Sequence, residues 1–240
     1  MILEAAGAAF VRLFSAEFRR LFLKSLGLTL LILVVLWIAL ERPVSTLALP
    51  WIGALLPGSG GWDSWFGLIA GILAGVALAL GLALLIGPVT AIVAGFFLDD
   101  VAEIIEREDY PADPPGQPLP WTQALGQSMK FFGVVIIGNL AALFMLLLPG
   151  LNIAAFFLVN GYLLGREFFE FAAMRFLAPP EARALRRRHA GTVFLAGLVI
   201  AAFLAVPLLN LLTPLFAAAM MVHVNKRVLA AEAGRGGRQT

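Results

Sequence analysis

The chain has 240 residues, of which 61% are hydrophobic and 13% are charged, whereas soluble domains average roughly 45–50% apolar and about 25% charged residues. This composition excludes an ordinary soluble globule, and it also excludes a disordered chain, which needs low hydrophobicity and a high net charge. The net charge is +2, and the hydrophobic residues are gathered in long uncharged runs. We therefore predict an all-α integral membrane protein with a single membrane domain over residues 1–240.

The first uncharged run, residues 25–40, is slightly short for a crossing, which takes about 20 apolar residues. It continues backward without proline, so we predict one long helix over 4–40 that is amphipathic at its start and crosses the membrane at its end. Arg19, Arg20 and Lys24 lie at the mouth of this crossing. Such charges commonly anchor a helix to lipid headgroups, but two adjacent guanidinium groups can instead bind a tetrahedral oxyanion.

The second run, residues 64–98, has no charge in 35 residues and predicts the second long transmembrane helix. Gly87 and Pro88 offer a position for a kink. A cytoplasmic loop over 99–130 is predicted to follow, acidic at its start and rich in proline toward its end.

The acidic start of this loop is a possible site. Asp99, Glu103 and Glu106 share one helical face by their spacing of four and three residues. With Asp100, such a cluster could hold Mg²⁺ in a membrane lipid transferase. Transferases of this kind need a second acidic motif, and the sequence has none.

The last two hydrophobic runs share the same break, a proline followed three positions later by asparagine. The pairs are Pro149 with Asn152 and Pro207 with Asn210, an internal repeat at an offset of 58 residues. Each half-run has roughly 14–18 residues, a length that fits half-penetrating segments better than full crossings. We predict two re-entrant helical hairpins, over 131–177 and 191–226.

The breaks have two interpretations. Each asparagine can cap the following helix, whose free N–H groups and positive dipole end would then face an anion within the membrane. Alternatively, the breaks are tight turns between packed helices. Arg166 and Glu170, four residues apart, can pair on one helix face; such a pair indicates function if it lies deep in the bilayer and is ordinary at the interface.

The basic residues predict the orientation. With the N-terminus in the cytoplasm, 16 of the 17 Lys and Arg residues lie on the cytoplasmic side and Arg42 alone lies opposite. Both termini are therefore predicted to be cytoplasmic, with a disordered basic tail over 228–240. The start of the chain does not resemble a signal peptide, because Glu4 interrupts it.

Residues for catalysis are scarce. The chain has no cysteine, and His189 and His223 have neither metal-ligand spacing nor an evident catalytic partner. We expect no enzyme activity, metal, cofactor or nucleic-acid partner.

In combination, these features resemble bacterial CysZ-type sulfate permeases, from about Phe10 to Arg227. The resemblance is carried by the double arginine, Gly87-Pro88, the two Pro/Asn breaks, and Gly95-Phe96-Phe97-Leu98-Asp99-Asp100-Val101 leading to Glu106 and Tyr110-Pro111.

The resemblance implies a homo-oligomer in the bacterial inner membrane, with two transmembrane helices and two half-penetrating pairs, that carries sulfate inward for cysteine biosynthesis. The anion-binding motif of these permeases is Gly-Leu-Arg, often with a second arginine. By this resemblance, it corresponds here to Glu17-Phe18-Arg19-Arg20. Glu17 stands in place of the glycine, where a carboxylate would repel sulfate or compete for the arginines. Asp99, Glu103 and Glu106 would form a charged vestibule, either paired with arginine or coupling transport to protons. The alternative is a non-transporting membrane scaffold of the same family; the lipid transferase comes third.

Overall fold

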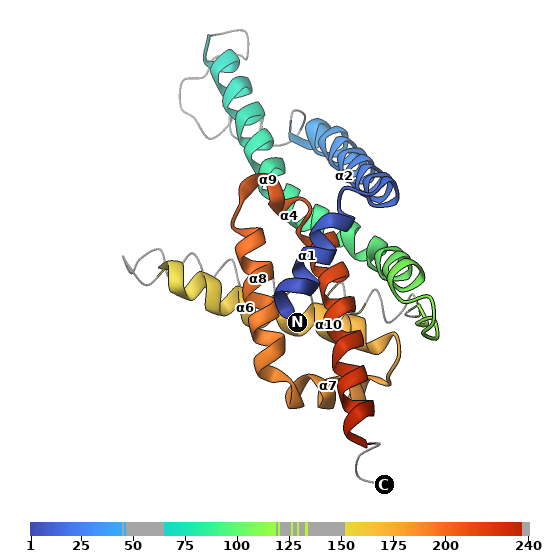
Figure 1. The fold of residues 1–240 in the computed structure, drawn as a ribbon. Helices are drawn as coiled ribbons and strands as arrows, with labels where there is room; N and C mark the ends of the chain where they lie inside the picture. Colours follow the sequence, from blue (N-terminus) through green and yellow to red (C-terminus); the bar gives the residue numbers. More distant parts are fainter. Residues whose placement is uncertain are drawn as a thin grey trace. The chain divides into compact units, whose positions relative to one another are not determined.

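The computed structural model describes residues 1–44, 46, 65–118, 120, 126, 129, 133 and 152–236, and every regular element in these ranges is a helix. The predicted all-α class is therefore confirmed. In chain order the helices are α1 (Ile2–Arg12), α2 (Ala16–Pro43), α4 (Trp65–Asp109), α6 (Asn152–Met174), α7 (Pro179–Arg188), α8 (Ala190–Leu204), α9 (Pro207–Asn210) and α10 (Thr213–Gly236) (Figure 1).

The chain divides into two compact units. One comprises Met1–Ser25 with Ala91–Thr240, and the other comprises Leu26–Thr90. The hydrophobic core of the first unit is built from α1, the start of α2, the end of α4, and helices α6 to α10.

Helix α2 is the clearest membrane crossing in the described part of the chain. Its 28 residues make it the one described helix that is long and apolar enough to span a bilayer unbroken. Leu31, Val35 and Ile38 are more than half exposed, as lipid-facing side chains are. Helix α4 runs without interruption through Gly87 and Pro88 for 45 residues, and contains a shorter apolar stretch, Gly71–Ala83.

The predicted single helix over 4–40 is instead two helices. The turn between α1 and α2 is capped by Ser15, whose Oγ accepts the backbone N–H of Phe18 at 3.3 Å. This is the usual bond from an N-cap side chain to the third residue of a helix. Because the hydrophobic pattern continues across this turn, hydrophobic periodicity does not predict the break between the two helices. The local sequence feature that indicates the break is the cap residue Ser15.

Helices α6 and α8 cross in backbone contact. A Cβ added at Gly197 would lie 1.9 Å from the carbonyl oxygen of Gly161 and 2.8 Å from the Cα of Gly165. Gly161 and Gly165 form the small-xxx-small pattern that allows such crossings in membrane proteins. The first hairpin helix is thereby joined closely to the second hairpin.

The second Pro/Asn break differs from its prediction. Pro207 begins the short helix α9, Asn210 is its last residue, and α10 begins only at Thr213. Asn210 is exposed, so the expectation that it caps the following helix was wrong: the extra turn of helix moves the next helix start beyond it. At the first break, α6 begins at Asn152.

Pro149 and most of the first half of the hairpin predicted over 131–177 lie outside the described residues. At the other end of α8, Pro179–Arg188 and Ala190–Leu204 meet at 89°. Such an angle fits either a broken crossing or a re-entrant segment.

Candidate functional site

The paired arginines lie in the first turns of α2. Phe18 and Leu21 are buried, at 1% and 7% exposure, and direct one face of the helix into the core. Arg19, Arg20 and Lys24 consequently lie on the exposed side. Within the described residues, neither arginine makes an ion pair or a side-chain hydrogen bond. Both guanidinium groups can therefore bind an anion.

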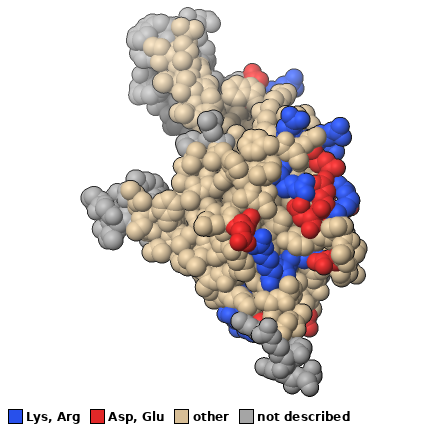
Figure 2. All heavy atoms as spheres, viewed as in Figure 1, with Lys and Arg blue, Asp and Glu red and all other residues tan. Residues whose placement is uncertain are grey.

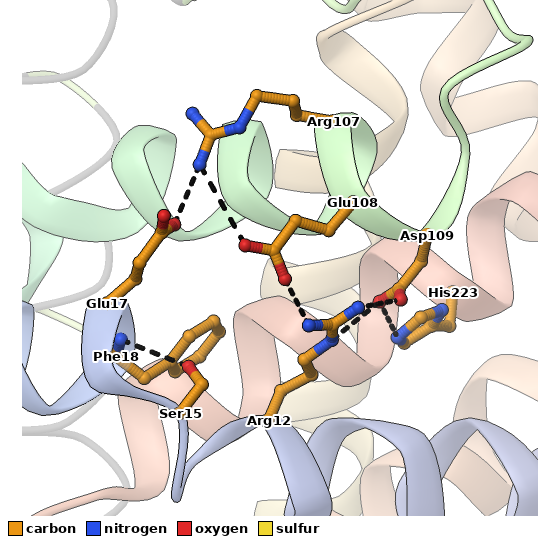
Figure 3. A network of polar contacts seen from close by, with 8 residues as sticks. All are labelled: Arg12, Ser15, Glu17, Phe18, Arg107, Glu108, Asp109 and His223. Atoms are coloured by element: carbon orange, nitrogen blue, oxygen red, sulfur yellow. Dashed lines mark hydrogen bonds and ion pairs between the residues drawn. The ribbon is translucent and has the colours of Figure 1, made fainter.

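Glu17 does not compete for these arginines. Its Oε2 accepts a hydrogen bond from the guanidinium of Arg107 at 2.7 Å (Figure 3). The expected competition is thus absent, because a cation on α4 takes the carboxylate. Arg107 is the single basic residue within Asp99–Asp113. Its isolation among seven acidic residues is the sequence feature that could have identified it as an ion-pair partner.

A network of charges continues from this pair. Arg12 on α1 bonds to both Glu108 and Asp109 at the end of α4, and Asp109 lies beside His223 on α10 (Figure 3). Figure 2 shows acidic and basic side chains gathered together on this face, beside broad areas that carry none. The network joins helices that the sequence places far apart.

His223 is held neutral in this network. The His223 side chain is 4% exposed, and its Nδ1 lies 2.9 Å from the hydroxyl of Tyr110. Burial lowers the pKa of His223 to about 4, although the Asp109 carboxylate acts in the opposite direction.

We expect this histidine to make stability depend on pH. In the unfolded chain its pKa is about 6.5, so its neutral burial costs nothing above that pH, and stability falls as pH drops from about 6.5 toward 4. The full loss is about 3 kcal/mol. Thermal unfolding in detergent should show wild type losing more stability than His223→Gln between pH 7 and pH 4. Parallel pH profiles for the two proteins would contradict the prediction.

Asp99 and Glu106 are bound by a buried arginine that the sequence analysis missed. Arg175, whose side chain is 2% exposed, donates to Glu106 at 2.7 Å and 3.0 Å and also to Asp99. The backbone N–H of Gly116 donates to the same Glu106 carboxylate at 2.9 Å. The sequence analysis left two roles open for the acidic vestibule, pairing with arginine or coupling transport to protons. Asp99 and Glu106 are paired with an arginine.

The other acids of the cluster are exposed. Glu103 and Asp100 face outward. Partial desolvation by the neighbouring groups still raises the pKa of Asp100, and the charge of Glu103 adds to this, while Lys24 opposes it. Among the described residues, no group of three or more His, Cys, Asp or Glu side chains is arranged to hold a metal ion, and Asp99 is bonded to Arg175. Asp99, one of the acids predicted for a magnesium site, is thus paired with a guanidinium group.

Arg166 and Glu170 form a loose pair. Their side-chain atoms are 3.7 Å apart, whereas Arg186 on α7 approaches the same Glu170 at 2.7 Å. Glu170 therefore ties the end of α6 mainly to α7.

The comparison with known families agrees with this arrangement. The family model described as "Sulfate transporter CysZ/Etoposide-induced protein 2.4" matches residues 5–214, most of the chain. The chain belongs to this family. The predicted resemblance is confirmed, and the family is one of transporters rather than enzymes. A search of curated proteins found no match. The matched range contains the arginine pair of α2 and the charged residues of α1 and α4 around it, whereas His223 lies beyond its end.

Proposed function

We propose that the chain is a sulfate transporter or channel of the bacterial inner membrane that carries sulfate inward for cysteine biosynthesis. The observation that carries the proposal is the exposure of Arg19 and Arg20 without an ion-pair partner in the described residues, in a chain of a sulfate transporter family. An isolated cation pair of this kind is chemically suited to a divalent tetrahedral anion.

The site would work by charge and by hydrogen-bond geometry. Two adjacent guanidinium groups offer several planar donors to sulfate oxygens, and the start of α2 adds the positive end of its dipole. Lys24, about one turn further, adds a third positive charge. Because these side chains are exposed, sulfate stays hydrated and can be released, as conduction requires.

The proposed path continues through the membrane part. We propose that α4 is the second full crossing and that the hairpins around α6 and around α8 to α10 are half-penetrating. Their helix starts at Asn152 and Thr213 would replace part of the hydration shell of sulfate. Irregular backbone at this depth must be buried in protein or line a water-filled cavity. Contacts with further copies of the chain would bury it, and we therefore propose a homo-oligomer. Both termini are proposed to be cytoplasmic.

The test is uptake of radiolabelled sulfate by proteoliposomes. We expect Arg19→Ala with Arg20→Ala to reduce the initial rate at least about tenfold, because each charge-assisted hydrogen bond contributes about 1.5–3 kcal/mol. The matched control is Arg183→Ala with Arg187→Ala, which removes two exposed arginines from α7 and should leave uptake unchanged.

Two outcomes would contradict the proposal. One is wild-type uptake equal to that of empty vesicles, and the other is an unchanged rate in the Arg19 and Arg20 variant. Competition by selenate, molybdate and chloride in the same assay reports whether the site selects tetrahedral dianions.

A non-transporting membrane scaffold is the second candidate. The family description also names an etoposide-induced protein, and that part of the name refers to no transport. A scaffold would form a stable oligomer but carry no sulfate, so uptake in the same assay separates the two functions.

A further inference from the structure

Glu17 could pair with either of two cations. It lies three residues before Arg20 on the same helix, a spacing at which opposite charges meet. The Glu17 side chain is 44% exposed, so burial does not hold it in one conformation. Its position depends on the hydrogen bond that it accepts from Arg107 at 2.7 Å.

Arg107 is directed toward Glu17 by the charges around it. Its nearest alternative partner, Glu108, is 4.0 Å away and bonds to Arg12, which also binds Asp109 (Figure 3). With those two carboxylates bound by Arg12, Arg107 makes its short contact with Glu17. In this network, loss of Arg107 would leave Glu17 without its cation.

We propose that Arg107 is a positioning residue for the anion site: it holds Glu17 away from the arginine pair and so keeps Arg19 and Arg20 free for sulfate. This inference rests on the proposed function. Without Arg107, Glu17 turns toward Arg20, occupies donors that would otherwise bind the anion, and places an unneutralised negative charge beside a dianion.

The expected effect falls on sulfate affinity. At exposed positions, one competing ion pair and one added repulsion together weaken binding about threefold to tenfold. The maximal rate should change less than the half-saturating sulfate concentration, because the path beyond the site is unaltered.

The experiment compares four variants with wild type in sulfate uptake by proteoliposomes, over a range of sulfate concentrations. Arg107→Ala should raise the half-saturating concentration about threefold to tenfold. Arg107→Ala with Glu17→Ala should restore it, because no carboxylate remains to compete. Arg107→Lys should resemble wild type, and Glu17→Ala alone should bind sulfate at least as tightly as wild type, because it removes the carboxylate and leaves the Arg107 cation unneutralised.

The double variant is the decisive measurement. If it remains as impaired as Arg107→Ala, then Arg107 does not act through Glu17 and the inference is overturned. Unchanged affinity in Arg107→Ala would also overturn it. Thermal unfolding of each variant shows whether the protein is folded, and restored affinity in the double variant cannot be explained by a general structural defect.

Failure of this inference differs from failure of the proposed function. If uptake depends on Arg19 and Arg20 but Arg107→Ala behaves as wild type, the positioning role alone is wrong. If wild type carries no sulfate, or carries it equally well without the arginine pair, both proposals are overturned.

Discussion

Replacing Arg175 by methionine is expected to destabilise the protein by about 3–5 kcal/mol, because a buried carboxylate loses its partner. Glu106 is 5% exposed and receives two hydrogen bonds from this guanidinium. After the substitution, the hydrogen-bond donor that remains for Glu106 among the described residues is the backbone N–H of Gly116. Asp99 suffers less, since its side chain is 26% exposed and can be hydrated.

The measurement is thermal unfolding in detergent, with two comparisons. Arg175→Met combined with Glu106→Gln should recover part of the loss, because it removes the buried charge along with its partner. Arg183→Met changes an exposed arginine on α7 and should have little effect. An Arg175→Met protein within about 1 kcal/mol of wild type would show that the buried pair contributes only as much as a surface pair.

Gly197→Ala is expected to disrupt the crossing of α6 and α8. The added Cβ would lie 1.9 Å from the carbonyl oxygen of Gly161 and 2.8 Å from the backbone of Gly165. Backbone atoms cannot move aside as a side chain can, so the two helices must separate. Overpacking of this severity costs about 3 kcal/mol or more, and we expect reduced accumulation in the membrane or a lower unfolding temperature.

The matched control is Gly191→Ala on the same helix. No atom lies within 4 Å of a Cβ built at Gly191, and alanine is the better helix former, so its stability should be equal to or above that of wild type. If both alanine variants behave alike, the close contact at Gly197 is not important for packing.

Local patterns predicted much of the molecule. Long uncharged runs gave the all-helical class and the crossing in α2, since transfer of a helix into lipid depends on its own side chains. The spacing of Phe18 and Leu21 accounts for the exposure of Arg19 and Arg20 on the opposite side. The order of motifs was sufficient to indicate the family.

Predictions failed where local geometry or remote partners decide the structure. Ser15 caps a new helix inside a continuous hydrophobic pattern, and one extra turn after Pro207 removes Asn210 from the start of α10. Hydrophobic periodicity contains no information about either break.

The sequence by itself determined that this chain is a helical membrane protein of a sulfate transporter family, with a double arginine at the start of its first crossing. Only the tertiary structure decided which charges neutralise one another. Arg107 and Glu17 are 90 positions apart, and Arg175 and Glu106 are 69 apart. An ion pair depends on distances in space, and for residues so remote in sequence those distances are set by how the helices pack.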